Sequence, residues 1–226
     1  MIQALLQRYE KKIERRKLEK RTAFGAFAGR IGLVSNLFLF VSKFMIGLLS
    51  GSVSIMADAI NSLSDTISSV LTLVGFYIAG KPADKEHPYG HERFEYISGM
   101  LVSLVITFIG FEFLTTSVDR ILHPESIKVT PILFAVLALS IGIKIWQGLF
   151  YKKVSAKIDS QALVASAKDS FNDVYTTLAV LISAFIEGVT GLRIDGYIGF
   201  LIAAYIIYSG LQLIREFINE LMGMRP

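Results

Sequence analysis

The sequence is dominated by six apolar stretches, each long enough to form a helix that crosses a lipid bilayer. They cover residues 24–49, 53–79, 96–121, 129–151, 161–189 and 194–215. A crossing helix needs about 20 largely apolar residues. Hydrophobic residues make up 53% of the 226 residues, and the mean hydropathy is +0.54. These values argue against a soluble enzyme and against disorder, so we predict an all-α polytopic membrane protein with six transmembrane helices.

Lysine and arginine are distributed unevenly around these stretches. With the N-terminus inside, sixteen of the 23 Lys and Arg fall in the inner flanks, three in the outer loops and four within or beside the stretches. Cytoplasmic flanks of membrane proteins are enriched in basic residues. We therefore expect both termini in the cytoplasm and the chain in the cell membrane. The partner implied by these positive charges is lipid rather than nucleic acid.

The first 22 residues differ from the rest of the chain because they are strongly basic. Their apolar residues fall near one helical stripe: Ile2, Leu5, Leu6, Tyr9 and Ile13. Such a helix suits an anionic cytoplasmic membrane surface, although a solvated charged helix is an equal alternative. We expect residues 1–22 to form this interfacial helix, residues 23–217 a six-helix domain, and residues 218–226 the start of a linker.

Charged residues interrupt five of the six stretches. They are Lys43, Asp58, Asp65, Glu112, Lys144, Lys168, Asp169 and Asp173. An ionisable side chain at the bilayer centre costs about 2.5–3.5 kcal/mol on insertion scales, so they cannot all face lipid. We expect some to pair inside the bundle and others to line a cavity that holds water or ions. For Glu112 and Lys144, pairing or snorkelling is the favoured interpretation.

Two stretches carry acidic and amide residues four positions apart. Asn61 and Asp65 lie one helical turn apart on the second stretch, as do Asp169 and Asp173 on the fifth. Asp65 and Asp173 each lie roughly 18 Å into their spans at 1.5 Å per residue, so both pairs should meet near the midplane. Carboxylates at one depth repel each other unless protons or a cation neutralise them. We expect a divalent cation there; interhelical hydrogen bonding or pairing to the intramembrane lysines is the alternative.

The residue types of this cluster favour a hard cation. The chain has no cysteine, and its three histidines, His87, His91 and His123, lie in the expected loops. Oxygen donors alone suit ions such as manganese(II), whereas zinc sites usually recruit imidazole or thiolate. A metal-dependent membrane enzyme is disfavoured because no Ser, Cys or His joins the cluster. Asp58 lies seven residues before Asp65, where it would either guard the outer mouth or make a structural hydrogen bond.

Three motifs resemble those of the cation diffusion facilitators, a family of dimeric metal–proton antiporters. The motifs are GSVSIMADAINSLSD at 51–65, KPADKEHPYGHERFE at 81–95, and the Asp169-x-x-x-Asp173 spacing. The resemblance implies a homodimer and a tetrahedral transport site formed by Asn61, Asp65, Asp169 and Asp173. Zinc-transporting members usually carry His or Asp at the first of these positions and His at the third. Asn61 and Asp169 stand there in this sequence, which resembles the manganese branch. The resemblance leaves His87 and His91 as either a cytoplasmic metal contact or a structural turn.

The sequence departs from the family pattern at its C-terminus. Members commonly continue into a cytoplasmic domain, whereas this sequence ends at Pro226, so we expect either a truncated chain or a short member. The predicted function is export of manganese(II) in exchange for protons by alternating access, without a resident cofactor. The alternatives are transport of iron(II), cobalt(II) or zinc(II), and a metal-binding membrane scaffold that transports nothing.

Overall fold

Six long helices make up almost all of the computed structural model, which describes residues 2, 6–7, 9–10, 20–78 and 92–222. The helices are α2 (Lys20–Ser50), α3 (Val53–Ile78), α4 (Glu92–Leu122), α5 (Pro131–Ile158), α6 (Gln161–Thr190) and α7 (Asp195–Leu221). Each contains one of the six predicted stretches almost entirely. No strand occurs within these described ranges, which confirms the prediction of an all-α fold for them.

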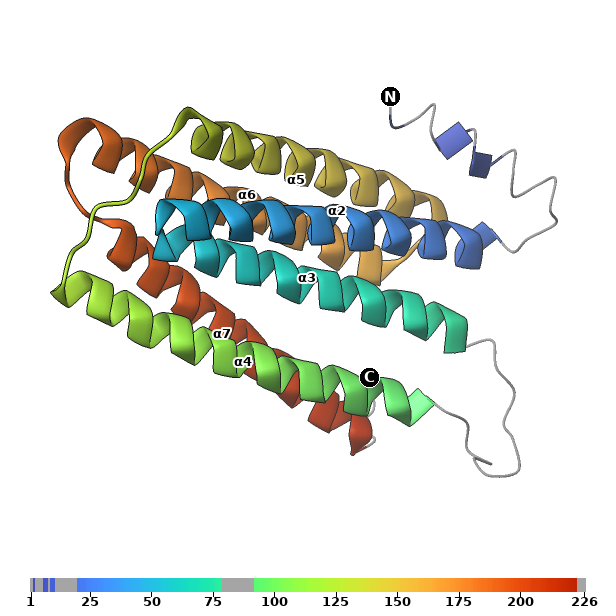
Figure 1. Cartoon of the computed structure of the whole chain (residues 1–226). Helices are drawn as coiled ribbons and strands as arrows, with labels where there is room; N and C mark the ends of the chain where they lie inside the picture. The colour runs from blue at the N-terminus through green and yellow to red at the C-terminus, as the bar shows by residue number, and fades with distance from the viewer. Residues whose placement is uncertain (1, 3–5, 8, 11–19, 79–91, 223–226) are drawn as a thin grey trace.

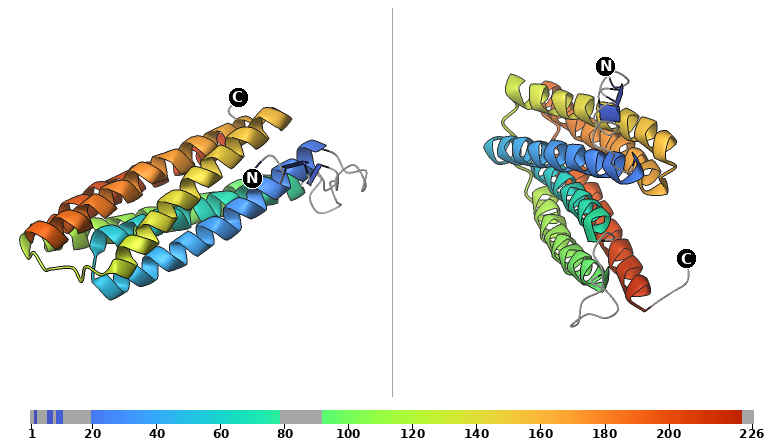
Figure 2. Two further views of the ribbon diagram at one scale, coloured as in Figure 1. Left: turned by 90° about the horizontal axis from the view of Figure 1, so that it is seen from above. Right: turned by 90° about the vertical axis from the view of Figure 1, so that its right-hand side faces the viewer.

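The helices run up and down through one elongated bundle (Figure 1). We call the end where α2 begins and α7 ends the proximal end, and the end where α2 ends and α5 begins the distal end. The helices pack mainly as three pairs, α2 with α3, α4 with α7, and α5 with α6. α3 lies centrally and contacts α2, α4, α6 and α7, while α4 and α7 diverge from the other helices in the end-on view (Figure 2). α3 and α6 therefore meet inside the bundle.

Local sequence signals define several helix ends. The hydroxyl of Thr130 accepts a hydrogen bond from the Leu133 amide at 3.3 Å, and Pro131 occupies the first turn of α5, where its missing N–H is not needed. Ser160 caps α6 in the same way. Gly191 ends α6 with φ 72°, a left-handed conformation that glycine adopts without steric strain. These signals place the turns at both ends of α5 and α6.

The start of α3 is capped by a carboxylate from α7. Asp195 Oδ2 accepts a hydrogen bond from the Val53 amide at 2.8 Å, and Oδ1 accepts the hydroxyls of Ser52 at 2.6 Å and Ser54 at 2.5 Å. Asp195 is buried. A negative charge at a helix N-terminus satisfies amides that have no partner within the helix. This contact joins two helices 142 residues apart in the chain.

The interior consists of two apolar clusters separated by a polar layer. The distal cluster draws on all six helices and includes Ile46, Ile55 and Leu137. The proximal cluster includes Phe150 and Leu163, which lie near the close of α5 and the start of α6. Between them lie buried charged and polar side chains, among them Lys43, Asp58, Asn61, Lys144 and Asp173. An ionic layer is thus placed midway along the bundle by the apolar packing on either side.

Close backbone approach fixes the α4–α7 pair. A Cβ atom added to Gly110 of α4 would lie 2.9 Å from Cγ1 of Ile207 and 3.2 Å from Cγ2 of Ile206 on α7. Small residues at helix contacts allow this spacing in membrane bundles. In contrast, a Cβ added to Gly142 of α5 would meet nothing within 4 Å.

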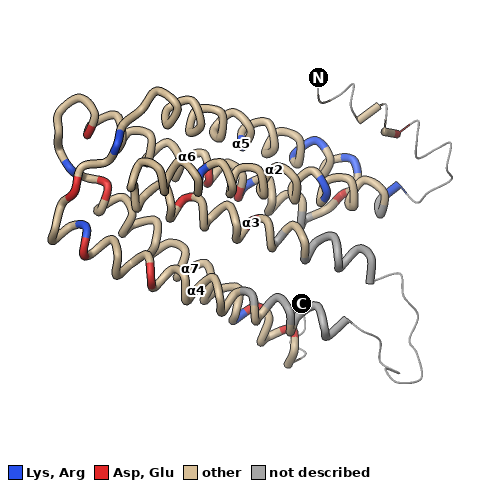
Figure 3. Tube along the Cα trace, viewed as in Figure 1, with Lys and Arg blue, Asp and Glu red and all other residues tan. Residues whose placement is uncertain are grey.

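The outer surface of the bundle is largely apolar. Exposed apolar side chains occur along every helix, for example Phe38 on α2, Phe108 on α4 and Leu201 on α7. Within the described residues, α2, α5, α6 and α7 contain segments long and apolar enough to cross a membrane. Most of the basic residues lie toward the proximal end, where some acidic residues also occur, and both signs of charge occur at the distal end (Figure 3). A multi-pass membrane protein is therefore supported, while crossing by α3 and α4 and the cytoplasmic side of the termini stay predictions.

The described residues of the N-terminal segment lie against the proximal end of the bundle. Ile2 and Leu6 are buried in the proximal cluster, and the ring of Tyr9 stacks on Phe27 with centroids 4.0 Å apart. The carboxylate of Glu10 accepts a hydrogen bond from Lys157 of α5 at 2.7 Å, and this contact holds the pKa of Glu10 below its usual value. At these positions the predicted stripe packs against protein, and its contact with lipid stays a prediction.

Candidate metal site

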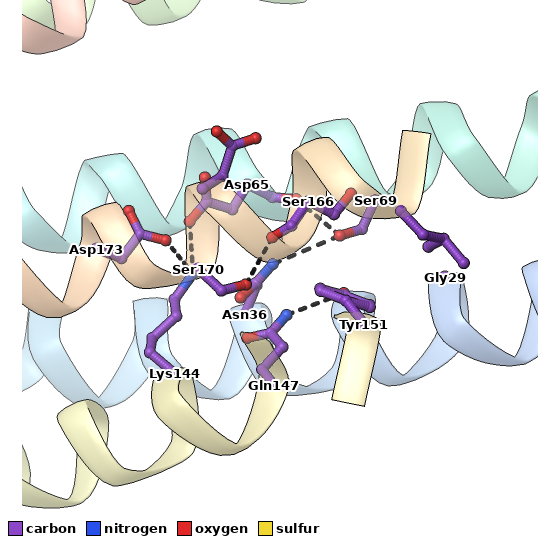
Figure 4. Close-up of a pocket in the computed structure, with 12 residues that line it drawn as sticks. Gly29, Asn36, Asp65, Ser69, Lys144, Gln147, Tyr151, Ser166, Ser170 and Asp173 are labelled. Carbon is purple, nitrogen blue, oxygen red and sulfur yellow. Dashed lines mark hydrogen bonds and ion pairs between the residues drawn. The ribbon is translucent and has the colours of Figure 1, made fainter. Parts of the chain in front are cut away.

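Three helices bring two carboxylates to one cation in the middle of the bundle. Lys144 of α5 places its Nζ atom 2.7 Å from Oδ2 of Asp65 on α3 and 2.5 Å from Oδ2 of Asp173 on α6 (Figure 4). The exposed fractions of these side chains are 1% for Lys144, 6% for Asp173 and 23% for Asp65. Burial makes an unpaired charge very costly. The arrangement confirms the expectation that Lys144 pairs inside the bundle.

Asn61 completes the hydrogen bonding of Asp173. Its Nδ2 atom donates to Asp173 Oδ1 at 2.6 Å, while Asp173 Oδ2 accepts from Lys144. Both oxygens of this carboxylate are therefore engaged. For Asn61 to act as a metal ligand, its amide has to turn so that Oδ1, an acceptor, replaces the donating nitrogen.

The fourth predicted ligand, Asp169, shares the pocket of this cluster but makes no hydrogen bond or ion pair with its members. Asp169 is one turn before Asp173 on α6, has an exposed side chain, and lines the same pocket. Among the described residues, no three His, Asp or Glu side chains lie close enough together to hold a metal ion as they stand. The structure thus joins Asn61, Asp65 and Asp173 through direct contacts and Lys144, but not Asp169. Metal binding by the four residues stays a prediction.

The other candidate residues lie elsewhere. His87 and His91 fall outside the described residues, and His123 lies in the distal loop, where its Nδ1 is 3.1 Å from Asp119 Oδ1. Glu112 and Lys168 are exposed on α4 and α6.

Asp58 takes part in a second, sealed ion pair. Its Oδ2 atom is 2.8 Å from Nζ of Lys43, and neither side chain has any exposed area. Thr177 of α6 donates to the same oxygen at 3.0 Å, and Lys43 also donates to Thr177 at 2.9 Å and to Ser62 at 3.3 Å. This cluster joins α2, α3 and α6 on the distal side of Asn61. The structural hydrogen bond considered for Asp58 is present, and its role as a gate stays a prediction.

A pocket leads from the carboxylates toward the proximal end of the bundle (Figure 4). It encloses about 480 Å³ of space, part of which is open to the surroundings. Its lining comes from α2, α3, α5 and α6 and is mostly polar: Gly29, Asn36, Asp65, Ser69, Lys144, Gln147, Tyr151, Leu163, Ser166, Asp169, Ser170 and Asp173. The pocket thus gives Asp65 and Asp173 a polar surrounding on the proximal side, whereas the fully buried Lys43–Asp58 pair lies on their distal side.

Several pocket residues were not identified from the sequence. Gln147 and Tyr151 lie three and seven residues after Lys144 on α5, and Ser166 and Ser170 lie seven and three residues before Asp173 on α6. Each of these four therefore shares a helical face with a charged residue that the sequence did single out. Polar residues at helical spacing inside an apolar stretch mark a face turned away from lipid. That pattern was available in the sequence and would have indicated the lining.

Long helices with an apolar exterior and ionic clusters inside define a multi-pass membrane protein with a buried layer of charged side chains. Residues 30–222 match the family model for the cation efflux transmembrane domain. The chain therefore belongs to the cation efflux family, whose members are metal-ion transporters and not enzymes.

Similar proteins come from archaea and bacteria. An uncharacterized transporter of Methanocaldococcus jannaschii is 32% identical over 87% of this chain and 69% of its own length. The manganese efflux system protein MneP of Bacillus subtilis is 28% identical over 92% of this chain and 70% of its own. The magnetosome protein MamM of Paramagnetospirillum magneticum is 36% identical over 67% of this chain and 48% of its own. The matches thus span between about half and about two thirds of these relatives.

Proposed function

We propose that this chain exports manganese(II) from the cytoplasm in exchange for protons. The observation that carries the proposal is the convergence of Asp65 and Asp173, from different helices, on one cation position. Two carboxylates that share a position repel each other when no cation lies between them. A divalent ion that enters this position is held by oxygen from α3 and α6 together. Asn61 and Asp169, on the same two helices, are the further ligands.

The choice of manganese is supported by the donor set and by the relatives. All four proposed ligands offer oxygen, the donor preferred by harder divalent ions. Two of the similar proteins, MneP and MneS of Bacillus subtilis, are manganese efflux system proteins by name. Iron(II) accepts the same oxygen ligands and is the rival ion.

The direction and the mechanism of transport are supported by the asymmetry of the bundle. The pocket extends from Asp65 and Asp173 to the proximal end, where the basic residues gather, as expected for a cytoplasmic surface. The opposite side carries the fully buried pair of Lys43 and Asp58, which would act as the closed gate. In alternating access, this arrangement is the state that loads ions from the cytoplasm. Protons entering from the other side would neutralise the carboxylates after the ion leaves.

The test is metal flux in proteoliposomes with an imposed pH gradient, comparing manganese(II), iron(II), cobalt(II) and zinc(II). We expect gradient-driven flux selective for manganese, and a loss of at least about a hundredfold in Asp173→Ala, since a hydrogen-bonded charged ligand is removed. The matched control is Asp119→Ala, an exposed residue of α4 outside the pocket. Equal zinc and manganese flux would contradict the ion assignment. Manganese binding without flux would identify a scaffold.

A further inference from the structure

Lys144 supplies the proposed metal site with a cation that belongs to the chain itself. Its ammonium lies between Asp65 and Asp173, bonded to the Oδ2 atom of each. These are the two oxygens that face a common point between α3 and α6. Because a divalent ion at that point would need the same oxygens and carries charge of the same sign as the ammonium, the two cations exclude each other.

A second set of acceptors for the ammonium lies in the same pocket. Gln147 is three residues after Lys144, on the same face of α5. Its Nε2 atom donates to Tyr151 at 3.0 Å, and Nδ2 of Asn36 donates to Ser69 at 3.4 Å. The carbonyl oxygens of both amides are buried, and within the described residues neither has a hydrogen-bond partner. Both side chains line the pocket that begins at Lys144 (Figure 4).

The chemistry of these groups is complementary. An ammonium has three donors and no acceptor, and an amide oxygen is an acceptor with two lone pairs. A buried acceptor without a donor is destabilising. The two amide oxygens are therefore open acceptors, in the same pocket, for an ammonium that leaves the carboxylates.

We propose that Lys144 is an internal counter-ion that exchanges places with the transported metal. Its ammonium lies between Asp65 and Asp173 when the site is empty and moves to the oxygens of Gln147 and Asn36 when the metal binds. The ammonium keeps its proton throughout, and only hydrogen bonds are exchanged. This inference rests on the proposed function and identifies a residue that, together with the incoming protons, offsets the negative charge of the empty carrier. The return of the empty carrier then depends on Lys144, whereas movement of the loaded carrier does not.

Two flux measurements on Lys144→Met separate these steps. Net manganese(II) uptake into metal-free proteoliposomes requires return of the empty carrier, whereas exchange of radioactive for internal manganese(II) does not. We expect the ratio of exchange to net uptake to rise at least about tenfold in Lys144→Met. Lys152→Met, an exposed lysine of the same helix, should keep the ratio of the unmodified chain. An equal fall in both fluxes would overturn the proposal.

Binding of manganese(II) to the purified chain, measured by titration calorimetry, tests the exchange of places directly. Lys144→Met should bind at least about tenfold more tightly because no ammonium has to leave. Lys144→Arg should bind at least about tenfold more weakly, because a guanidinium holds two carboxylates with a fixed fork of donors. If Lys144 has only a structural role, both variants should bind manganese(II) more weakly, and that result would overturn the proposal. Unchanged binding by both variants would overturn it as well.

The outcomes also separate this inference from the proposed function. If the unmodified chain moves no manganese(II) in either flux assay, the proposed function fails, and opposite shifts in the two binding constants still support the exchange of places. If the unmodified chain transports normally while both variants change binding in the same direction, only the inference fails. Should Lys144→Met not fold, the direction of the Lys144→Arg shift decides: tighter or equal binding overturns the proposal.

Discussion

The sealed pair of Lys43 and Asp58 allows a quantitative test of the buried ionic layer. The two charges are 2.8 Å apart and have no exposed area. Removal of one partner leaves the other as an uncompensated buried charge, which typically costs about 3–5 kcal/mol. We expect this loss of unfolding free energy in Lys43→Met and in Asp58→Asn. The double variant should lie within about 2 kcal/mol of the unmodified chain, because no buried charge is then left unpaired.

The assay is a double-mutant cycle on thermal unfolding in detergent. A single-variant loss of this size lowers the apparent Tm by about 10 °C for a chain of this length, and the coupling energy should be about 4 kcal/mol or more. Lys128→Met, which removes an exposed charge in the distal loop, should change the Tm little. Additive losses in the double variant would refute the reasoning, since they would show that the two charges do not stabilise each other.

Three further predictions concern the helix contacts and the N-terminal segment. Asp195→Ala should lower the unfolding free energy by about 2–4 kcal/mol, because the start of α3 loses its acceptor. Asp195→Asn should recover part of this loss, because an amide oxygen can still accept the hydrogen bond from the Val53 amide. Gly110→Ala should destabilise by about 1–3 kcal/mol through overpacking, whereas Gly142→Ala, which meets nothing, should stabilise by about 0.5–1 kcal/mol. Glu10 has a lowered pKa, so its ion pair is present above the pKa of the unfolded chain and is lost as pH falls through the lowered value. The labelling rate of Leu6→Cys in this cysteine-free chain, divided by that of a free thiol at the same pH, should therefore rise in that acidic range and not at neutral pH.

The helices themselves could be predicted from the sequence because their signals are local. Long apolar stretches, Thr130 before Pro131 and Gly191 after α6 each act within a few residues of the position they define. The four-residue spacing likewise placed Asn61 on the same face as Asp65. Such features need no knowledge of which helices are neighbours.

The partners of the charged residues could not be predicted in the same way. The pairing of Lys144 with Asp65 and Asp173 depends on how far α5 slides along α6, and side-chain packing sets that register. A Cβ on Gly148 would lie 3.0 Å from the ring of Phe171, so these residues fix the two helices against each other. The partner of Asp58 could not be predicted either. Its spacing from Asp65 predicts only which face of α3 it occupies, whereas its pairing with Lys43 depends on how α2 packs against α3.

The cap that Asp195 provides for α3 also bears on how the chain is made. A ribosome adds about 5–20 residues per second, so the 142 residues that separate Val53 from Asp195 take roughly 7–28 s to synthesise. During that interval Ser52 can accept the Ile55 amide, but the amides of Val53 and Ser54 have only water or lipid headgroups as acceptors. The distal end of the bundle is completed only when α7 emerges. A nascent chain that is interrupted after α6 would therefore carry an α3 whose Val53 amide lacks its carboxylate acceptor.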